Sequence, residues 1–308
     1  MELGYDVIII GGGPAGLTAG IYAARSRLKT LLLERFMPGG QVALTDFIEN
    51  YPGFPDGING IELMQKMESQ SARFGLQIEN SETTQIRLRP DNWKTIVTAD
   101  TEYKTKTIII ATGAESKKLG IPGEKEFLGK GISYCATCDG PFFKEKDIAV
   151  IGGGDSALEE GLYLTRFAKS VKIIHRRDQL RATKLIQERA MADPKIKFIL
   201  DSIPIEIIGT NALEALRIKN VKSNEISVIP ITGLFIYVGL VPRTAIVKDL
   251  ITLDEYGYII ADMTMATSVP GIYAAGDVRK TSLRQVATAV GDGAMAAFSA
   301  EKYIEAHF

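Results

Sequence analysis

Short apolar runs along the chain predict strands that are buried on both faces of a parallel sheet. Such runs are rich in Val, Ile and Leu and are bounded by polar or glycine residues. They occupy residues 7–10, 31–33, 107–111, 148–151, 171–174 and 271–275. Residues 287–304 are instead rich in Ala and contain no Pro, which predicts a long helix packed on a core.

The chain contains an internal repeat of a strand, a glycine turn, a helix and a second strand. Residues 5–35 align without a gap to residues 146–176, at a constant offset of 141 (146 − 5). This order of elements is the βαβ unit of a parallel sheet. The length of 308 residues suits about two domains. The sequence therefore predicts an α/β protein with two nucleotide-binding domains, which residues 115–118 and 240–244 would link.

Composition and charge narrow the class of protein. Hydrophobic residues make up 45%, charged residues 24%, and the formal net charge is −1. This composition is ordinary for a globular protein, and the charge gives no basic field of the kind that nucleic-acid binding needs. No stretch approaches the roughly 20 apolar residues that span a bilayer, and the N-terminus lacks the basic segment of a signal peptide. We expect a cytoplasmic protein that binds neither nucleic acid nor membrane.

The first glycine turn contains Gly11, Gly13 and Gly16 and lies between a predicted strand and a predicted helix. Glycines at this spacing permit a tight turn and let backbone N–H groups approach a pyrophosphate at the helix N-terminus. Glu34 follows Gly11 by 23 residues, at the end of the second strand, where a carboxylate can accept hydrogen bonds from ribose hydroxyls. The alternative is a turn with incidental glycines, but the acid and the strand–turn–helix context favour a dinucleotide site.

The second glycine turn contains Gly152, Gly154 and Ala157. The repeat unit to which it belongs ends with basic residues instead of an acid. The position equivalent to Glu34 begins a cluster formed by His175, Arg176, Arg177 and Arg181. One guanidinium group can donate two parallel hydrogen bonds to two phosphate oxygens, whereas a carboxylate would repel a 2′-phosphate. A solvated basic strand end is the alternative, but the place of the cluster in a matched repeat favours NADP. One domain therefore suits a ribose without a 2′-phosphate, and the other suits NADP.

The only two cysteines, Cys135 and Cys138, are separated by two residues and followed by Asp139. Zinc usually needs four ligands, and the chain has only two histidines, so a metal site is disfavoured. Inert core cysteines remain an alternative. We favour a dithiol/disulfide pair, because this spacing lets sulfurs meet across a helical turn, and a helix N-terminus lowers a thiol pKa. Asp139 could then serve as general acid or base, although a lone Asp is more often a cap or a surface charge.

The motifs together resemble those of the bacterial-type, low-molecular-weight thioredoxin reductases, and the match covers nearly the whole chain. In chain order they are residues 11–16 (GGGPAG), 39–41 (GGQ), 49–53 (ENYPG), 111–113 (ATG), 133–140 (SYCATCDG), 152–157 (GGGDSA), 175–177 (HRR), 181 (R), 267–277 (TSVPGIYAAGD) and 284–285 (RQ). Their order and spacing are far more specific than any one of them. Two positions depart from the expected pattern, namely Pro141 after the cysteine motif and Arg243 where Asn is expected.

The resemblance implies two Rossmann-like dinucleotide-binding domains, with the NADPH domain inserted into a discontinuous FAD domain. The FAD domain would comprise residues 1–114 and 245–308, and the NADPH domain, which carries the cysteine pair, residues 115–244. It also implies a homodimer, in which one domain rotates against the other during the catalytic cycle.

The resemblance further implies a role for each motif residue. Glu34 and Gln41 would contact the adenosine half of FAD or its pyrophosphate, and Cys138 would face the flavin while Cys135 attacks thioredoxin. The predicted FAD residues are Gly11, Gly13, Pro14, Ala15, Gly16, Glu34, Arg35, Gly40, Gln41, Asn50, Ala111, Thr112, Gly113, Gly276, Asp277, Arg284, Gln285 and Val286. Asn50, Asp277, Arg284 and Gln285 would lie along the flavin and the ribityl chain. The predicted NADPH residues are Gly152, Gly154, Asp155, Ser156, His175, Arg176, Arg177 and Arg181.

The sequence thus predicts an NADPH-dependent thioredoxin-disulfide reductase. A hydride passes from NADPH to FAD, the flavin reduces the Cys135–Cys138 disulfide, and the dithiol reduces thioredoxin by exchange. Three alternatives stay open: a reductase of another protein disulfide, of the glutaredoxin or peroxidase kind; a relative that takes electrons from ferredoxin or delivers them to oxygen; and a non-catalytic flavin-binding redox sensor. The intact arginine cluster speaks against the ferredoxin or oxygen relative, and the intact cysteine pair against the sensor.

Overall fold

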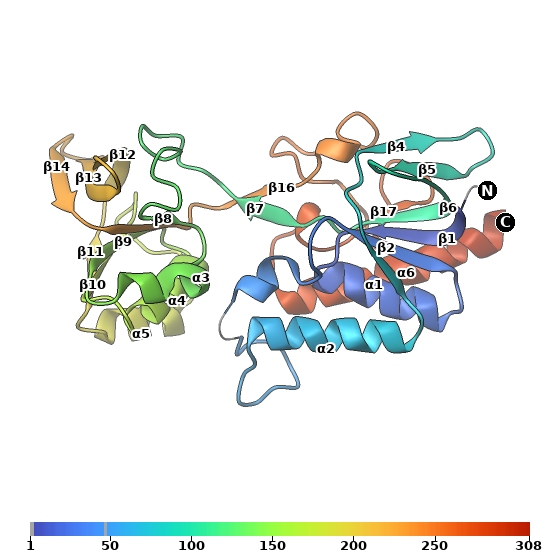
Figure 1. Cartoon of the computed structure of the whole chain (residues 1–308), viewed down its shortest axis with the longest axis horizontal. Coiled ribbons are helices and arrows are strands. Elements are labelled where there is room, and N and C mark those ends of the chain that lie inside the picture. Colours follow the sequence, from blue (N-terminus) through green and yellow to red (C-terminus); the bar gives the residue numbers. More distant parts are fainter. Residues whose placement is uncertain (1–2, 46–47) are drawn as a thin grey trace. The chain divides into compact units, whose positions relative to one another are not determined.

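The computed structural model describes residues 3–45 and 48–308, except for the side chains of residues 3, 137 and 138. The chain divides into two compact units (Figure 1), one formed by residues 1–115 with 241–308 and the other by residues 116–240. It crosses between them in β7 (Ala114–Ser116) and β16 (Leu240–Pro242), which pair with each other. Both crossings lie in the segments that the sequence predicts as linkers.

The first unit is built on a sheet with the strand order β3-β2-β1-β6-β5-β4, in which β17 also pairs with β6. Its strands are β1 (Leu3–Ile10), β2 (Thr30–Glu34), β3 (Gln77–Asn80), β4 (Gln85–Leu88), β5 (Lys94–Val97), β6 (Glu102–Ile110) and β17 (Ile272–Ala274). β1 is parallel to both β2 and β6, and its residues 7–9 are fully buried, as the apolar runs predict. Because β17 pairs with β6, the C-terminal segment completes the sheet that the N-terminal segment begins.

Three helices pack on one face of this sheet: α1 (Pro14–Arg25), α2 (Gly60–Arg73) and α6 (Val286–His307). The predicted C-terminal helix is confirmed as α6. α1 and α6 approach closely, since a Cβ on Gly293 would lie 2.2 Å from the carbonyl oxygen of Ala15. The opposite face is covered by side chains of residues 246–269 and of Val278. The unit also contains the short 3-10 helices η1 (Gly40–Leu44), η3 (Ala245–Val247) and η4 (Gly276–Val278).

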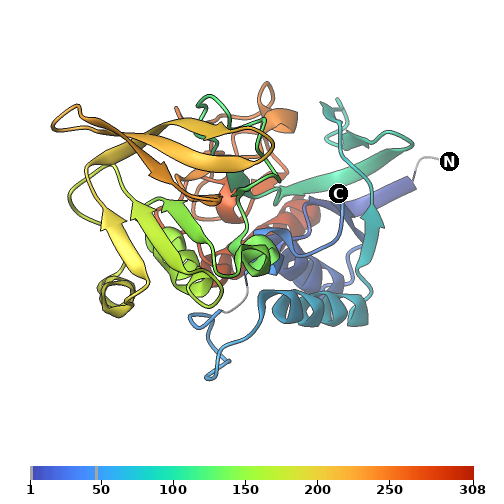
Figure 2. The ribbon, with the colours of Figure 1, turned by 60° about the vertical axis from the view of Figure 1, so that its left-hand side comes forward.

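The second unit is built on a parallel sheet with the strand order β11-β10-β9-β15-β8. Its strands are β8 (Ile132–Ser133), β9 (Asp147–Ile151), β10 (Ser170–Ile174), β11 (Ile196–Ile199) and β15 (Gly233–Ile236). One core lies between the sheet and the helical segments α3 (Ala136–Asp139), η2 (Gly140–Phe143), α4 (Asp155–Leu164) and α5 (Lys184–Ala192). An antiparallel sheet of β12 (Ser202–Gly209), β13 (Leu213–Asn220) and β14 (Ile226–Pro230) covers the other face (Figure 2). The predicted α/β class and the repeated βαβ unit are confirmed.

Candidate nucleotide and redox sites

The first glycine turn joins β1 to α1 through backbone contacts that exclude side chains. Gly11 has φ +107°, and a Cβ there would lie 2.3 Å from the carbonyl oxygen of Ala111. A Cβ on Gly16 would lie 1.9 Å from the carbonyl oxygen of Gly11. Pro14 occupies the first helical position, where its lack of an N–H costs no hydrogen bond. These positions fix the turn that begins α1.

Gly13 differs from the other glycines of the turn, because open space lies in front of it. It is the N-cap of α1 with φ −76°, and a Cβ there would meet no atom within 4 Å. Unpaired backbone N–H groups and the positive end of the helix dipole meet at such a position, and both favour a phosphate. The turn therefore fits the pyrophosphate of a dinucleotide.

Glu34, at the end of β2, holds this turn through its carboxylate. Its Oε2 accepts a hydrogen bond of 2.7 Å from the N–H of Gly12, and its Oε1 accepts one of 3.3 Å from the N–H of Phe36. The side chain thus stands beside the glycine turn, where the repeat pattern predicts a ribose contact. The neighbouring Arg35 forms an ion pair with Glu82, in which its Nη1 lies 3.1 Å from Oε1.

The segment after β2 returns to the same turn. The N–H of Gly39 donates to the carbonyl of Gly12 at 2.8 Å. A Cβ on Gly40, which has φ +57°, would lie 3.4 Å from the Cα of Gly13. Gln41 follows in η1 and is exposed. Gly40 and Gln41 therefore begin η1 close to the N-terminus of α1, as a shared pyrophosphate site requires.

The ends of β6 and β17 bring two further motifs to this edge of the sheet. Ala111 donates its N–H to Ile10, Thr112 donates its hydroxyl to the carbonyl of Arg243 at 2.7 Å, and Gly113 has φ +67°. Gly276 has φ +76°, and a Cβ there would lie 3.0 Å from the Cβ of Ala15. The first unit therefore assembles its predicted FAD residues at the carboxyl ends of parallel strands, where open α/β sheets bind ligands.

Asp277 and Arg284 supply partly buried polar groups at the same edge. Burial raises the pKa of Asp277, which the charge of Arg284 partly offsets and that of Asp292 reinforces. The guanidinium of Arg284 stacks on Tyr258 at 4.2 Å, and its buried Nε–H has no hydrogen-bond partner among the described residues. Buried donors in proteins are nearly always paired. An orphaned donor beside a partly buried carboxyl group fits a bound polar ligand such as a ribityl chain.

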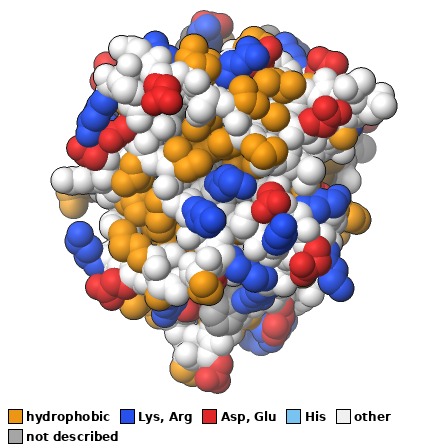
Figure 3. Space-filling view, turned by 90° about the vertical axis from the view of Figure 1, so that its left-hand side faces the viewer, with side chains coloured by type: hydrophobic (Ala, Val, Ile, Leu, Met, Phe, Trp, Pro, Cys, Tyr) orange, Lys and Arg blue, Asp and Glu red, His pale blue; other side chains and the backbone are white. Residues whose placement is uncertain are grey.

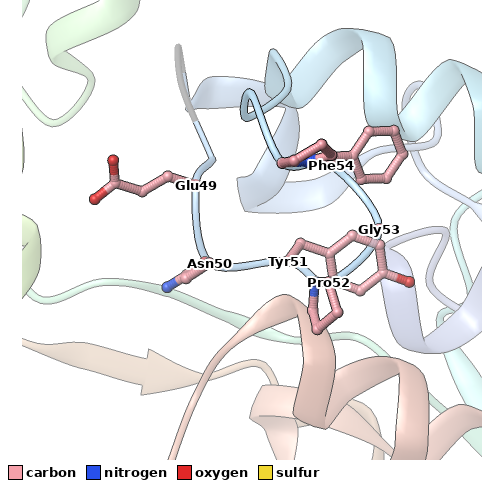
Figure 4. A pocket seen from close by; sticks show the side chains of 7 residues that line it. Glu49, Asn50, Tyr51, Pro52, Gly53 and Phe54 are labelled. Carbon is pink, nitrogen blue, oxygen red and sulfur yellow. The ribbon is translucent and has the colours of Figure 1, made fainter.

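Asn50 and Gln285 link the loop after η1 to the start of α6. The amide of Asn50 donates to Oε1 of Gln285 at 3.0 Å, and Gln285 forms a capping box with Thr288 before Val286 begins the helix. Residues 49–55 line a cavity of about 360 Å³ (Figure 4). The rings of Tyr51 and Phe54 stack within this loop at 6.1 Å. Asn50 and Gln285 therefore lie together, as their shared predicted role requires.

The second glycine turn repeats the geometry of the first. Gly152 has φ +152°, and a Cβ there would lie 2.5 Å from the carbonyl oxygen of Tyr237. Gly154, the N-cap of α4, has φ −97° and no atom within 4 Å of a Cβ position. Asp155 accepts a 2.6 Å hydrogen bond from the N–H of Thr183, and Ser156 is exposed. The space at the N-terminus of α4 therefore fits a second pyrophosphate.

The basic cluster divides into one buried and three exposed side chains. His175 is only 4% exposed and packs behind the turn, since a Cβ on Gly153 would lie 2.4 Å from its Nδ1. Burial lowers its pKa, and the charge of Arg181 lowers it further. Arg176, Arg177 and Arg181 are exposed, and none forms an ion pair with a described residue. The arginines are therefore placed to receive a phosphate, whereas the imidazole supports the turn from behind.

Cys135 precedes the short helix α3, and it is disulfide-bonded. The chain has one other cysteine, Cys138, whose side chain lies outside the described part of the structure. Asp139 ends α3, is partly exposed, and borders a cavity of about 460 Å³ together with Phe142. The redox motif thus lies in the second unit, beside an exposed aromatic side chain.

Sequence reasoning missed several polar residues that support these sites. They are Arg279 with Asp292 in the first unit, and Glu124 with Tyr134 and Tyr237 in the second. Tyr134 lies within the cysteine motif of residues 133–140, but its contact with Glu124 is not part of that motif, and the other four residues lie within no recognised spacing pattern. In the described part of the chain no cluster of His, Cys, Asp and Glu could hold a metal ion. No described helix is long and apolar enough to cross a membrane.

The fold and the two turns define a flavin- and nicotinamide-dependent class, and comparison with known proteins identifies the family. The pyridine nucleotide-disulphide oxidoreductase family matches residues 5–293, and the chain belongs to this family. It is 50% identical to a thioredoxin reductase of Listeria monocytogenes over 303 residues, which cover 98% of this chain and 94% of that protein.

Two crystal structures of thioredoxin reductases are also similar. The enzyme of Lactococcus lactis has a TM-score of 0.96 and 53% identity, with 98% of this chain and 99% of that chain covered. The enzyme of T. acidophilum has a TM-score of 0.93 and 38% identity, with 99% of each chain covered. The resemblance read from the motifs is thereby confirmed.

Proposed function

We propose that the protein is an NADPH-dependent reductase of the thioredoxin disulfide, with FAD bound in the first unit and NADPH in the second. One observation carries the proposal. The chain has two glycine turns of the same geometry, one ending on the carboxylate of Glu34 and the other on exposed arginines, together with a disulfide at Cys135. A carboxylate suits an unmodified ribose, and arginines suit a 2′-phosphate.

The cofactors supply hydride and electron transfer when they are bound. The residues of the chain bind the cofactors and would carry out the thiol exchange and the proton transfer. Gly13 and Gly154 leave room for the two pyrophosphates, and the orphaned Nε–H of Arg284 is available to a polar group of the flavin chain. Cys135 would form a mixed disulfide with thioredoxin, and Asp139, at the end of α3, would be the group that transfers a proton to a leaving thiolate.

The protein partner would meet a surface of mixed character. Figure 3 shows one face on which hydrophobic patches alternate with Lys, Arg, Asp and Glu side chains. In the second unit, Phe142 follows the redox motif closely and is 72% exposed. Exposed aromatic groups are common anchors in protein interfaces. This supports a protein disulfide as substrate in preference to a small one.

We also propose a homodimer in the cytoplasm. α1 and α6 lie side by side and expose three large apolar side chains, Tyr22, Met295 and Phe298. Exposed apolar groups on two neighbouring helices are typical of an interface between copies. A chain whose only cysteines form a redox pair suits a reducing compartment.

An NADPH-driven disulfide assay tests the function. The protein is mixed with NADPH and, in turn, a bacterial thioredoxin, a glutaredoxin and a peroxidase disulfide, with NADH as the control. We expect rapid NADPH oxidation with thioredoxin alone and little with NADH. Faster oxidation with glutaredoxin or the peroxidase than with thioredoxin would refute thioredoxin as the substrate.

A further inference from the structure

The backbone around Cys135 is held by hydrogen bonds on both sides. Its N–H donates to the hydroxyl of Ser133 at 2.9 Å, and its carbonyl accepts from the N–H of Asp139 at 3.2 Å. These bonds are local, within the motif itself. One further bond comes from a distant part of the second unit, and it involves the residue directly after Cys135.

The hydroxyl oxygen of Tyr237 accepts the N–H of Ala136 at 3.0 Å. Ala136 begins α3, so this N–H is one of the donors that have no partner within the helix. The residue is only 1% exposed, so water does not replace the tyrosine oxygen. The hydroxyl of Tyr237 therefore accepts a hydrogen bond from a buried N–H in the residue next to Cys135.

Tyr237 is itself fixed at the end of β15, between the redox motif and the second glycine turn. Its N–H donates to the carbonyl of Ile151 at 2.8 Å, and its carbonyl oxygen would lie 2.5 Å from a Cβ on Gly152. Burial raises the pKa of Tyr237, and the charges of Glu160 and Asp139 raise it further. The side chain is therefore a neutral hydroxyl on a rigid strand end.

Loss of this hydroxyl would favour the reduced form of Cys135 for two reasons. The buried N–H of Ala136 would lack its acceptor, and because it belongs to the residue next to Cys135, its free positive end would stabilise the Cys135 thiolate. In addition, a less fixed backbone lowers the effective concentration of one thiol at the other, and a disulfide then forms less readily. Both effects make the dithiol a weaker reductant.

We propose that Tyr237 is a positioning residue for the redox reaction, whose hydroxyl takes up the Ala136 N–H and thereby makes the dithiol at Cys135 a stronger reductant. The inference rests on the proposed function in that it takes the Cys135 disulfide to be redox-active. It assigns to Tyr237 a role that none of the predicted site residues has.

The test is the equilibrium of the holoenzyme with dithiothreitol. One dithiothreitol gives two electrons and two protons to the protein disulfide, which becomes a dithiol, while dithiothreitol closes to its cyclic disulfide. The dithiol fraction is counted by alkylation and mass spectrometry over a series of ratios of reduced to oxidised reagent. We expect Tyr237→Phe to shift the equilibrium toward the dithiol by about three- to tenfold, where tenfold equals about 30 mV.

The second readout is the rate at which Cys135 reacts with iodoacetamide at neutral pH, which should rise in Tyr237→Phe because more thiolate is present. Tyr256→Phe is the matched control, because that side chain is 72% exposed. Ala136→Pro removes the same hydrogen bond from the donor side, and proline suits the first helical position. In that background Tyr237→Phe should have no further effect.

An equilibrium and an alkylation rate within twofold of wild type in Tyr237→Phe would overturn the proposal, since the ring is kept and only the hydroxyl is lost. If Tyr237→Phe does not fold, Ala136→Pro alone still tests the proposal. This variant has no N–H that could stabilise the thiolate, so its alkylation rate should stay within twofold of wild type, and a larger rise would overturn the proposal. Because the titration uses no thioredoxin, its result is independent of the thioredoxin assay.

Discussion

Arg279 and Asp292 form a two-pronged ion pair in the first unit. The Nε of Arg279 lies 2.5 Å from Oδ2 of Asp292, and its Nη2 lies 2.7 Å from Oδ1. The same Oδ2 also accepts the N–H of Gly276 at 3.1 Å. The pair thus ties α6 to the turn after β17, which carries predicted FAD residues, and both side chains are largely buried.

Replacement of Asp292 by Ala should destabilise the protein strongly, because it leaves the Arg279 charge buried without a partner. We expect the free energy of unfolding to fall by about 3 kcal/mol or more. Urea denaturation of the flavin-loaded protein measures it. Glu102→Ala, which breaks the exposed pair with Arg87, is the control and should cost less than about 1 kcal/mol. Equal effects of the two variants would refute the structural role of the Arg279–Asp292 pair.

The two glycines of the first turn should respond differently to alanine. Gly16→Ala places a methyl group 1.9 Å from a carbonyl oxygen, so it should disrupt folding as well as FAD binding. Gly13→Ala meets no atom of the protein, so the methyl group should intrude only on the bound pyrophosphate. We expect Gly13→Ala to fold normally by circular dichroism and to lose FAD. Full flavin retention by Gly13→Ala would contradict the proposed FAD site.

The coenzyme preference should depend on the exposed arginines of the second unit. Arg176→Ala and Arg181→Ala should each reduce kcat/KM for NADPH by about ten- to hundredfold, since a charge-assisted hydrogen bond contributes about 1.5–3 kcal/mol. The kcat/KM for NADH should change little. Arg189→Ala on α5 serves as the control for loss of a positive charge. Equal loss with both coenzymes would exclude recognition of a 2′-phosphate.

Lys94 predicts a pH dependence of stability. It is 3% exposed, donates to the carbonyls of Asn92 and Lys106 at 2.9 and 2.8 Å, and burial lowers its pKa to about 8 from 10.5. Because the folded state binds the proton more weakly than the unfolded state, the contribution of Lys94 to stability rises as the pH increases from about 8 to 10.5 and does not change with pH below or above this window.

The pH dependence is measured as a difference between two proteins. Relative to Lys94→Met, wild type should gain on the order of 3 kcal/mol between pH 8 and 10.5, because each pKa unit corresponds to about 1.4 kcal/mol. Chemical denaturation at a series of pH values gives this difference. A constant difference across the range would show that Lys94 is not titrating differently in the folded state.

The sequence was most informative where local chemistry determines the backbone. The turns at Gly11 and Gly152 have positive φ angles that other residues rarely adopt. The neighbouring apolar runs form β1 and β9. The βαβ repeat and the helix α6 followed from the same patterns. These features depend on contacts between near neighbours in the chain, so a single sequence suffices to predict them.

The rest depends on contacts between distant residues. Tyr237 and Ala136 are 101 positions apart, and nothing in either local pattern predicts their hydrogen bond. The burial of His175 behind Gly153 was likewise hidden, because the spacing suggests only that the residue ends a strand. In β14 apolar and polar residues alternate too weakly to predict a strand. It forms the edge of an antiparallel sheet because it pairs with β13.

The most direct test of the central claim is covalent capture of thioredoxin by single-cysteine variants. The partner is a thioredoxin whose resolving cysteine is serine and whose remaining cysteine is a mixed disulfide with thionitrobenzoate. Attack by a thiolate of the enzyme joins the two proteins and releases coloured thionitrobenzoate. NADPH should bleach the flavin in both Cys135→Ser and Cys138→Ser, because neither nucleotide site is altered.

We predict that Cys138→Ser, which keeps Cys135, forms the covalent complex, and that Cys135→Ser forms little. Capture by Cys135→Ser in place of Cys138→Ser would reverse the assignment of the attacking thiol. Undiminished NADPH-driven reduction of wild-type thioredoxin by both variants would contradict the account itself.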